Sequence, residues 1–285
     1  KFEVPDDAPK NLYYRCSVGS HQAMGNAIFV MEATEPTPIK VGALPALRTS
    51  GWNDRDYAGI GTNNSVMKFD RVNSAYLYVA ADATNWRMTS GSLSYWVYPT
   101  GTSATYEGIF SMSASGTNIN TERFETAYHN DVLVRYHASG NWDSMGVNKE
   151  KNKWQHHCFV IDTSPSPDTF TFYLNGKQTY QDNQVDSPFG GGKVEVGKMS
   201  TYFDGFIDDI MVHNVALNAN TVIQNYMNGR AGSYTTANSA CVLHIKADST
   251  YGDTTFTDAS SYGHTITNYN GVYHHINDDR TANTA

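Results

Sequence analysis

The sequence of 285 residues has few charged side chains and no concentration of positive charge. Asp, Glu, Lys and Arg together make up 17% of the chain, and the formal net charge is −8. Proteins that bind nucleic acid carry clusters of Lys and Arg because phosphate contacts dominate their binding. No such cluster occurs here, so a nucleic-acid partner is not expected. The acidic balance also argues against simple electrostatic capture of polyanionic sugars, although it leaves room for a local basic groove.

Cysteine is scarce, and long apolar runs are missing. The three cysteines, Cys16, Cys158 and Cys241, are far apart and form no Cys-x-x-Cys pair, so a zinc site is not expected. Three buried thiols are the preferred interpretation, and one disulfide with a free thiol stays open. No apolar run approaches the roughly 20 residues that span a bilayer, so no membrane span is predicted.

What the chain does contain is a long series of short segments that favour β-strands. From Val66 onward, runs rich in β-branched and aromatic residues recur at short intervals, separated by Gly, Asn, Asp, Ser or Pro. Such spacing is typical of an all-β sandwich or barrel. Residues 1–65 are less regular and rich in turn formers. They are predicted to form an extended N-terminal arm and a wrapping segment, with one short strand at 26–34.

Two local signals are more specific. The dipeptide Asn175-Gly176 lies between two strand-like runs and predicts a hairpin with a type I′ turn. One short helix is expected within residues 216–232, because Asn218 can cap its first turn and Gly229 can end it. We expect this helix to lie on an edge of the β structure.

Several motifs between residues 66 and 230 occur in a distinctive order. They are MKFDRVNSAYLYV, GSLSYWVYPTG, NKWQHHCFVID, FTFYLNGKQTY and YFDGFIDDIMVHNVALNANTV. In this order they resemble the laminin-G-like, concanavalin A-like jelly-roll domains. The resemblance implies an antiparallel β-sandwich over residues 66–232. It also implies a packing role for the Trp-x-His signature, in which His156 and its neighbour His157 point to opposite faces of a strand.

The C-terminal strands, residues 233–285, include a second and partial match. Residues 240–276 resemble the opening of the same domain, which in the family precedes the stretch that resembles 66–79. Three arrangements are open: a circularly permuted unit with the tail folded back, donation of the tail to a neighbouring copy, or the start of a second unit. Because unpaired sheet edges are rarely tolerated, we expect this tail to pack on a sheet.

Two adjacent carboxylates lie inside the apolar run FDGFIDDIMVHN, residues 203–214. Simple alternation places Asp208 on the face of Ile210 and Asp209 on the face of Ile207. One carboxylate therefore points inward or towards a strand edge, where it could accept backbone hydrogen bonds or bind a metal. Laminin-G-like folds often hold calcium at the rim of the sandwich. The resemblance therefore implies a structural calcium ion, with Asp209 and Asp258 as its ligands.

Catalytic chemistry has one candidate set, in YHNDVLVRYHA, residues 128–138. A lyase acting on uronates needs a base beside a group that neutralises the sugar carboxylate. Tyr128, Arg135 and His137 could supply these groups, but the Gln-Ile-His and Tyr-x-Lys-x-Gly-x-Tyr signatures of jelly-roll lyases are missing. Glycoside hydrolysis needs two neighbouring carboxylates. It is not expected, because the Glu-x-Asp-x-x-Glu motif of related hydrolases is missing and the candidate glutamates look isolated: Glu107, Glu125 and Glu195.

Aromatic side chains are the best candidates for ligand binding. Trp96 and Trp154 fall on predicted strands and are assigned to the core. Trp86 and Trp142 lie in turn-like stretches, where an exposed ring could stack on a sugar. We therefore predict that Trp86 and Trp142 contact a ligand.

These observations favour a non-catalytic β-sandwich that is extracellular or on a virion surface. Its partner would be a glycan, neighbouring copies of itself or other subunits of a particle. The alternative is a polysaccharide lyase that cleaves a uronate-containing glycan by β-elimination, and a purely architectural subunit is a third hypothesis. Enzymatic activity is left open, with the non-enzymatic interpretation preferred.

Overall fold

The structure is a computed structural model, and it describes residues 11–15, 25–29, 65–80, 88–101, 105–114, 123–137, 142–164, 167–183, 192–230 and 239–276. The chain divides into two compact units, Lys1–Gly51 and Trp52–Ala285. In the first unit, β1 (Asn11–Arg15) pairs antiparallel with β2 (Gly25–Phe29). Strand β2 overlaps the first part of the strand expected at 26–34, and residues 30–34 lie outside the described residues.

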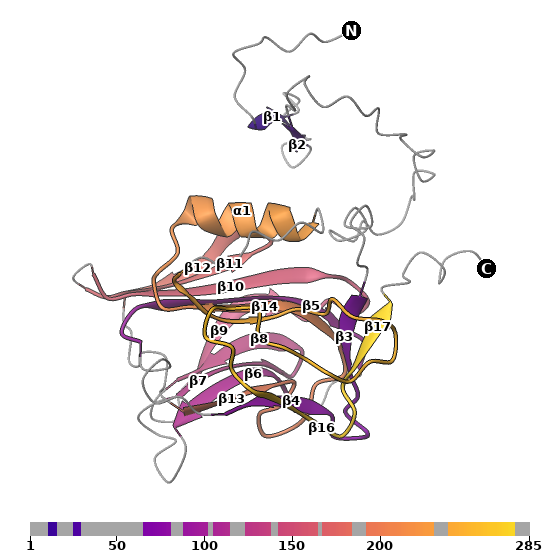
Figure 1. Ribbon diagram of the computed structural model, residues 1–285. Helices are drawn as coiled ribbons and strands as arrows, with labels where there is room; N and C mark the ends of the chain where they lie inside the picture. Colours follow the sequence, from indigo (N-terminus) through magenta and orange to yellow (C-terminus); the bar gives the residue numbers. More distant parts are fainter. Residues whose placement is uncertain are drawn as a thin grey trace, which may run out of the picture. The chain divides into compact units, whose positions relative to one another are not determined.

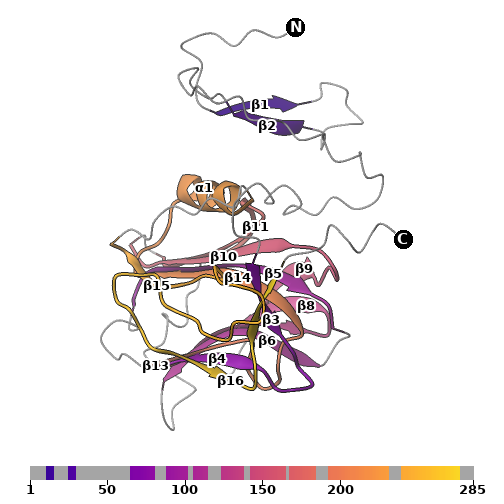
Figure 2. The ribbon, with the colours of Figure 1, turned by 45° about the vertical axis from the view of Figure 1, so that its right-hand side comes forward.

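The second unit contains two antiparallel sheets that lie face to face (Figures 1 and 2). The first sheet has the order β12-β11-β10-β5-β14-β3-β17, and β15 also pairs with β14. Its strands are β3 (Ser65–Phe69), β5 (Gly91–Pro99), β10 (Gln155–Asp162), β11 (Thr169–Leu174), β12 (Lys177–Asp182), β14 (Gly205–His213), β15 (Cys241–Ile245) and β17 (Tyr273–Ile276).

The second sheet has the order β16-β4-β13-β6-β7-β8-β9. Its strands are β4 (Tyr76–Val79), β6 (Tyr106–Ala114), β7 (Arg123–His129), β8 (Val132–Tyr136), β9 (Trp142–Asn148), β13 (Gly192–Val196) and β16 (Ile266–Tyr269). Together the two sheets confirm the predicted antiparallel β-sandwich.

The core lies between the sheets because alternate residues of the strands are apolar. In β7, Phe124 and Tyr128 belong to the buried core, whereas Glu125 between them faces the other side of the sheet. Leu93 and Phe159 contribute to the same core from the first sheet. Burial of this apolar surface is the main favourable term in folding, at about 25 cal/mol for each Å² removed from water.

The alternation predicted for β14 is wrong at its centre. Ile207 and Ile210 both belong to the core, although two residues lie between them, a spacing that would place them on opposite faces of a regular strand. The reason is a β-bulge between Asp208 and Met211, where Asp209 adopts a left-handed conformation with φ of 50°. An extra residue in one strand reverses the phase of the side chains that follow it.

The helix and the hairpin form where the sequence predicts them, although the helix does not end at Gly229 and continues to Arg230. Helix α1 (Ala219–Arg230) begins after Asn218, whose side chain accepts a hydrogen bond of 2.9 Å from the backbone N–H of Thr221. Asn175 and Gly176 join β11 to β12 with φ values of 51° and 75°, as a type I′ turn requires.

The predicted position of the helix, on an edge of the β structure, is wrong. Figure 1 shows α1 lying over the outer face of the first sheet, above β10 and β11. There Tyr226 stacks on Trp96, with ring centroids 5.6 Å apart, and Val222 packs against Val160. The outer face of this sheet carries large apolar side chains, and the helix removes them from water.

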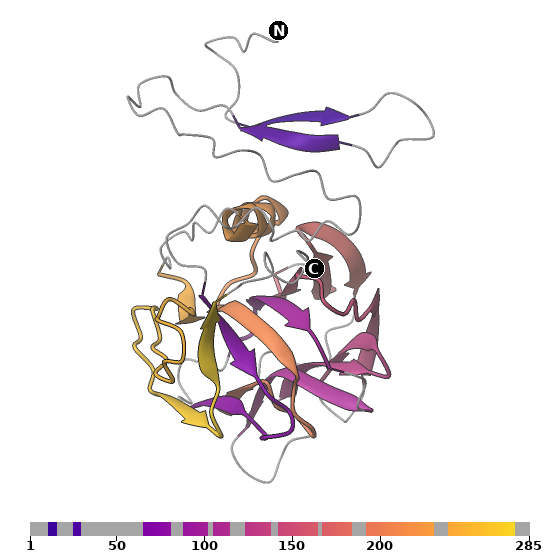
Figure 3. The same ribbon diagram turned by 90° about the vertical axis from the view of Figure 1, so that its right-hand side faces the viewer.

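The C-terminal strands lie within this sandwich. Strand β15 pairs with β14, β16 with β4, and β17 with β3. Figure 3 shows β16 and β17 beside β4 and β3, the first two strands of the sandwich in chain order. This is the folded-back arrangement, in which the tail lengthens both sheets of its own chain.

The described cysteines are free thiols. Cys158 and Cys241 are both buried, and burial raises the pKa of the Cys158 thiol and raises that of Cys241 to about 12. Cys16 lies outside the described residues. Within the described part of the chain, no helix is long and apolar enough to cross a membrane.

Candidate functional site

The two outer faces of the sandwich differ. Helix α1 covers part of the outer face of the first sheet. No helix of the described residues lies over the outer face of the second sheet. The outward side chains of the second sheet include aromatic rings at both ends and paired charges between them, so we describe this surface as the candidate site and call it the outer face.

One cross-strand row spans the outer face. Strand pairing places its residues opposite one another, in the order Tyr78, Glu195, Ser111, Glu125, Tyr136 and Trp142. The side chains of such a row lie about 5 Å from their neighbours. The row therefore has two carboxylates near its centre, on either side of the central strand β6, and aromatic rings towards both ends.

The first carboxylate of the row, Glu125, holds three polar contacts. Its Oε1 accepts a hydrogen bond of 2.8 Å from the Ser111 hydroxyl. Its Oε2 accepts a hydrogen bond of 2.7 Å from Arg123 Nε and forms an ion pair with the same guanidinium group. Arg123 also lies over the ring of Tyr136, 5.1 Å from its centre. The guanidinium is thus fixed between a carboxylate and an aromatic face.

The second carboxylate, Glu195, is arranged in the same way. Lys193 Nζ lies 3.0 Å from its Oε2, and Lys198 Nζ lies 2.9 Å from its Oε1. Lys198 also lies 4.1 Å from the centre of the Tyr76 ring. The pKa of Lys198 is raised because the hydrogen bond and charge of Glu195 outweigh the opposing effect of burial.

Aromatic rings gather at the β9 end of the outer face. Trp142 is 48% exposed and meets the His129 ring edge-on at 5.2 Å. Tyr106 lies 4.5 Å from His129 and 6.1 Å from Tyr136, measured between ring centres. These four side chains make a partly exposed aromatic surface, and the prediction that Trp142 lies on the surface is correct.

Tyrosines gather at the opposite end, over β4 and β16. Tyr76 and Tyr269 stack face to face at 4.7 Å, and Tyr269 meets Tyr78 edge-on at 6.2 Å. Tyr202 lies 6.0 Å from Tyr76. The outer face thus presents an aromatic platform at each end and ion pairs between them. This arrangement suits a ligand with apolar ring faces and polar edges.

The predicted lyase residues do not lie on the outer face. Tyr128 and Arg135 are each only 1% exposed, and both side chains point inward between the sheets. Tyr128 donates a hydrogen bond to Gln155, and Arg135 forms an ion pair with Asp143 and lies over the ring of Phe170.

Like Tyr128 and Arg135, His137 is buried, and it also contacts Asp143, with 3.6 Å between Nε2 and Oδ2. The charges and hydrogen bonds of His137 and Arg135 lower the pKa of Asp143 despite the opposing effect of burial. Tyr128, Arg135 and His137 are thus buried side chains that connect neighbouring strands within the sandwich. Trp86, the other predicted ligand-binding residue, lies outside the described residues.

The two glutamates of the row were not predicted as site residues from the sequence. Glu125 and Glu195 looked isolated because the order of the strands, not the order of the chain, makes them neighbours of Ser111. A signal was present nonetheless, since Arg123-x-Glu125 and Lys193-x-Glu195 each place a base and an acid on one face of a strand.

The predicted calcium ligands have other partners in this structure. Asp258 accepts hydrogen bonds of 2.9 Å from the backbone N–H groups of His244, Ser260 and His264, and one of 2.8 Å from the Ser260 hydroxyl. Asp209 is buried at the bulge of β14. Among the described residues, no group of three or more His, Cys, Asp or Glu side chains is arranged to hold a metal. Asp258 therefore serves as the organiser of a loop, and the calcium site stays a prediction.

We expect Asp258→Ala to lower the free energy of unfolding by about 2–4 kcal/mol, because buried backbone N–H groups would lose a charged acceptor. The measurement is urea unfolding in chelator and in calcium, with Glu150→Ala, which removes a carboxylate whose side chain is 50% exposed, as the control. The same loss in both buffers is expected. A rise in the wild-type melting temperature with calcium that Asp209→Ala abolishes would instead establish the metal site.

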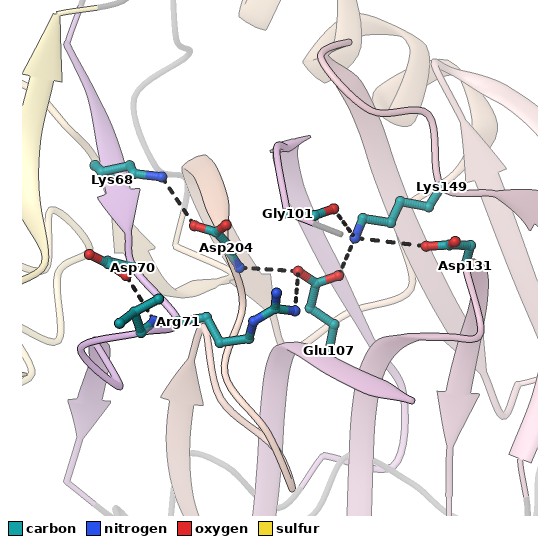
Figure 4. A network of polar contacts seen from close by, with 9 residues as sticks. Lys68, Asp70, Arg71, Gly101, Glu107, Asp131, Lys149 and Asp204 are labelled. Atoms are coloured by element: carbon teal, nitrogen blue, oxygen red, sulfur yellow. Dashed lines mark hydrogen bonds and ion pairs between the residues drawn. The ribbon is translucent and has the colours of Figure 1, made fainter. Parts of the chain in front are cut away.

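A buried ion network secures one end of the sandwich (Figure 4). Glu107 and Lys149 form an ion pair with both side chains almost fully buried. Lys149 Nζ also donates a hydrogen bond of 3.0 Å to the Gly101 carbonyl, and Glu107 Oε1 accepts one of 3.2 Å from the Asp204 backbone N–H. Arg71 lies 3.8 Å from the same oxygen. The network joins the ends of β5, β6, β9 and β14, and thus holds the strands beneath the outer face in place.

Comparisons with known proteins agree with the fold. No curated protein matches the sequence. Among solved structures, a candidate carbohydrate-binding protein of Bacteroides ovatus is 16% identical, with a TM-score of 0.55 over 76% of this chain and 60% of that chain. A heptameric SAP-like pentraxin of Limulus polyphemus is 14% identical, with a TM-score of 0.51 over 76% of this chain and 96% of that chain.

The chain therefore spans less than two thirds of the Bacteroides protein, and at these identities both likenesses establish the fold alone. The family model of the concanavalin A-like lectin/glucanases superfamily matches residues 73–223, which is more than half of the chain. That segment extends from just before β4 into α1 and includes most strands of both sheets. The chain thus belongs to the concanavalin A-like lectin/glucanases superfamily.

Proposed function

We propose that this protein is a non-catalytic carbohydrate-binding module whose ligand lies on the outer face of the second sheet. The observation that carries the proposal is the pair of aromatic platforms, around Trp142 and around Tyr76, with ion-paired polar groups between them. Sugar rings present apolar faces to aromatic side chains and hydroxyl groups to polar ones. The candidate carbohydrate-binding role of the Bacteroides protein, which shares the fold, is in keeping with this proposal.

The non-catalytic character is supported by the positions of the lyase residues. A base for β-elimination must reach a proton of the sugar. Tyr128 and Arg135 are 1% exposed, and both are engaged by partners within the core. On the outer face, Glu125 is paired with Arg123, and Glu195 is paired with Lys193 and Lys198. These positions suit the two glutamates to orient the basic side chains.

We expect Trp142→Ala to weaken glycan binding about tenfold, because the ring loses its stacking contact with a sugar. A glycan array first identifies the bound class, and calorimetry then compares the wild type with the variant. The matched control is Tyr262→Ala, which removes an exposed aromatic ring from the loop before β16. Equal binding by wild type and Trp142→Ala, or no retained glycan on the array, would contradict the proposal.

We further propose that the module works outside a cell, either on its own or on the surface of a particle such as a virion. Sparse charge and short, Thr- and Asn-rich strands support such a setting. An assembly role predicts that the mass from sedimentation rises with concentration. A constant monomer mass over the micromolar range would restrict the proposal to carbohydrate binding.

A further inference from the structure

The bases of the outer face are arranged symmetrically about the central strand β6. Strand pairing places Lys193 of β13 opposite position 113 of β6, and Arg123 of β7 opposite the same position on the other side. The two bases thus occupy one cross-strand row, next to the row that contains Glu195 and Glu125. Each base is followed two residues later in its own strand by the glutamate that holds it.

The bases lie nearer to the solvent than the carboxylates that hold them. The side chains of Lys193 and Arg123 are 34% and 19% exposed, whereas those of Glu195 and Glu125 are 8% and 9% exposed. A ligand that approaches the outer face therefore meets the cationic groups first. With Lys198 included, three bases stand against two carboxylates in this cluster, although the chain as a whole carries a net charge of −8.

The distance between the two bases sets the spacing of the ligand groups that can contact both of them. Lys193 and Arg123 are two strand spacings apart, which corresponds to about 10 Å between their backbone positions. This is close to the length of a disaccharide in an extended glycan. A glycan chain that runs across the strands, from the Tyr76 platform to the Trp142 platform, would therefore pass the two bases at sugar units that are two apart.

We infer that the outer face binds a linear acidic glycan that presents a carboxylate at every second sugar or more often. Arg123 binds one carboxylate of the ligand and Lys193 binds the next, while the aromatic platforms stack on sugar rings. Guanidinium and ammonium groups form strong, charge-assisted hydrogen bonds to carboxylates. This inference rests on the proposed function and adds the substrate class to it.

The test uses hyaluronan and polygalacturonate, each as the intact polymer and after reduction of its carboxylates to neutral alcohols. We expect the wild type to bind an intact polymer at least tenfold more tightly than its reduced form, because the reduced sugars lose both charge-assisted contacts. Arg123→Gln and Lys193→Gln should each weaken binding of the intact polymer about tenfold. Neither substitution should change binding of the reduced polymer.

The matched control is Lys177→Gln, which removes an exposed base from β12 of the first sheet and should leave binding unchanged. Melting temperatures verify that each variant is folded. Equal binding of intact and reduced polymers, or retention of neutral glycans alone, would overturn the acidic ligand while leaving the proposed function in place. Failure to retain any glycan, acidic or neutral, would remove both.

Discussion

Replacing Lys149 by methionine is expected to lower the free energy of unfolding by about 3–5 kcal/mol, because it leaves the carboxylate of Glu107 buried without its main partner. The Lys149 side chain is fully buried and also contacts the Gly101 carbonyl. The substitution therefore removes a partner from both the Glu107 carboxylate and the Gly101 carbonyl. Urea unfolding at neutral pH measures the effect. A loss of this size is a large fraction of the stability of an ordinary domain.

The control is Lys153→Met, which breaks the ion pair of Lys153 with Glu150. Those side chains are 48% and 50% exposed, so the expected loss is at most about 1 kcal/mol. Burial raises the pKa of Glu107, and Lys149 opposes this shift through its hydrogen bond and its charge. Without Lys149 the buried carboxyl should take up a proton more readily, so the stability deficit of Lys149→Met should shrink as the pH falls.

The double variant Glu107→Gln with Lys149→Met separates the charge effect from the loss of packing. It removes both charges, so it should be more stable than Lys149→Met alone. A deficit below about 1 kcal/mol for the single variant would show that the network contributes little. So would a double variant that is less stable than the single one.

The general architecture was predictable because its signals are local. Val66 and the segments after it have the composition of short strands, and Asn175-Gly176 and Asn218 specify a turn and a helix start through their own backbone preferences. The order of the motifs then selected a sandwich among all-β folds. None of this information requires knowledge of which strands are neighbours.

The outer face was not predictable because it depends on strand order. Ser111 lies between Glu125 and Glu195 only because β6 lies between β7 and β13, and β13 comes much later in the chain. Arg135 illustrates the same limit. Its strand has buried residues on both faces, and the inward position of Arg135, on the face of Leu133, is tolerated because Asp143 lies opposite it on β9. A pairing partner of this kind cannot be read from alternation within one strand.

The β-bulge at Asp209 shows a second limit. The run of residues 205–213 alternates regularly enough to suggest an ordinary strand, yet the left-handed conformation of Asp209 shifts the later side chains by one position. Aspartate tolerates this conformation better than most residues, but its presence in a strand does not by itself predict a bulge. The prediction that Asp208 shares a face with Ile210 was therefore wrong: Asp208 pairs with Trp96, which lies under the helix, whereas Ile210 belongs to the core between the sheets.

We expect the protein to lose most of its stability between pH 6.5 and about 4.5, because three histidines are buried in the neutral form. Burial is the main cause in each case, and it lowers the pKa of His157 to about 3 and those of His213 and His244 to about 4. For His244 the charges of Lys246 and His213 act in the same direction, whereas Asp258 opposes them.

An unfolded chain returns these histidines to a pKa near 6.5. Between pH 6.5 and about 4 the unfolded state therefore binds more protons than the folded state, so stability falls as the pH falls. Well above pH 6.5 the three histidines are neutral in both the folded and the unfolded state, so they cost no stability there. At pH 5 each histidine should cost about 2 kcal/mol, or about 6 kcal/mol together, with a slope that approaches 4 kcal/mol per pH unit. Urea unfolding at intervals of half a pH unit measures this dependence.

His157 provides the sharpest variant because its ring lies among aromatic side chains, 5.6 Å from Phe172 and 5.4 Å from Tyr95. His157→Leu removes one titrating group, so the slope between pH 6 and 5 should fall by about one third. Phe172→Leu is the control, because it disturbs the same core without removing a proton-binding group. It should lower stability equally at every pH and leave the slope unchanged. An unfolding free energy that stays constant from pH 7 to 5 would show that these histidines take up protons without unfolding the sandwich.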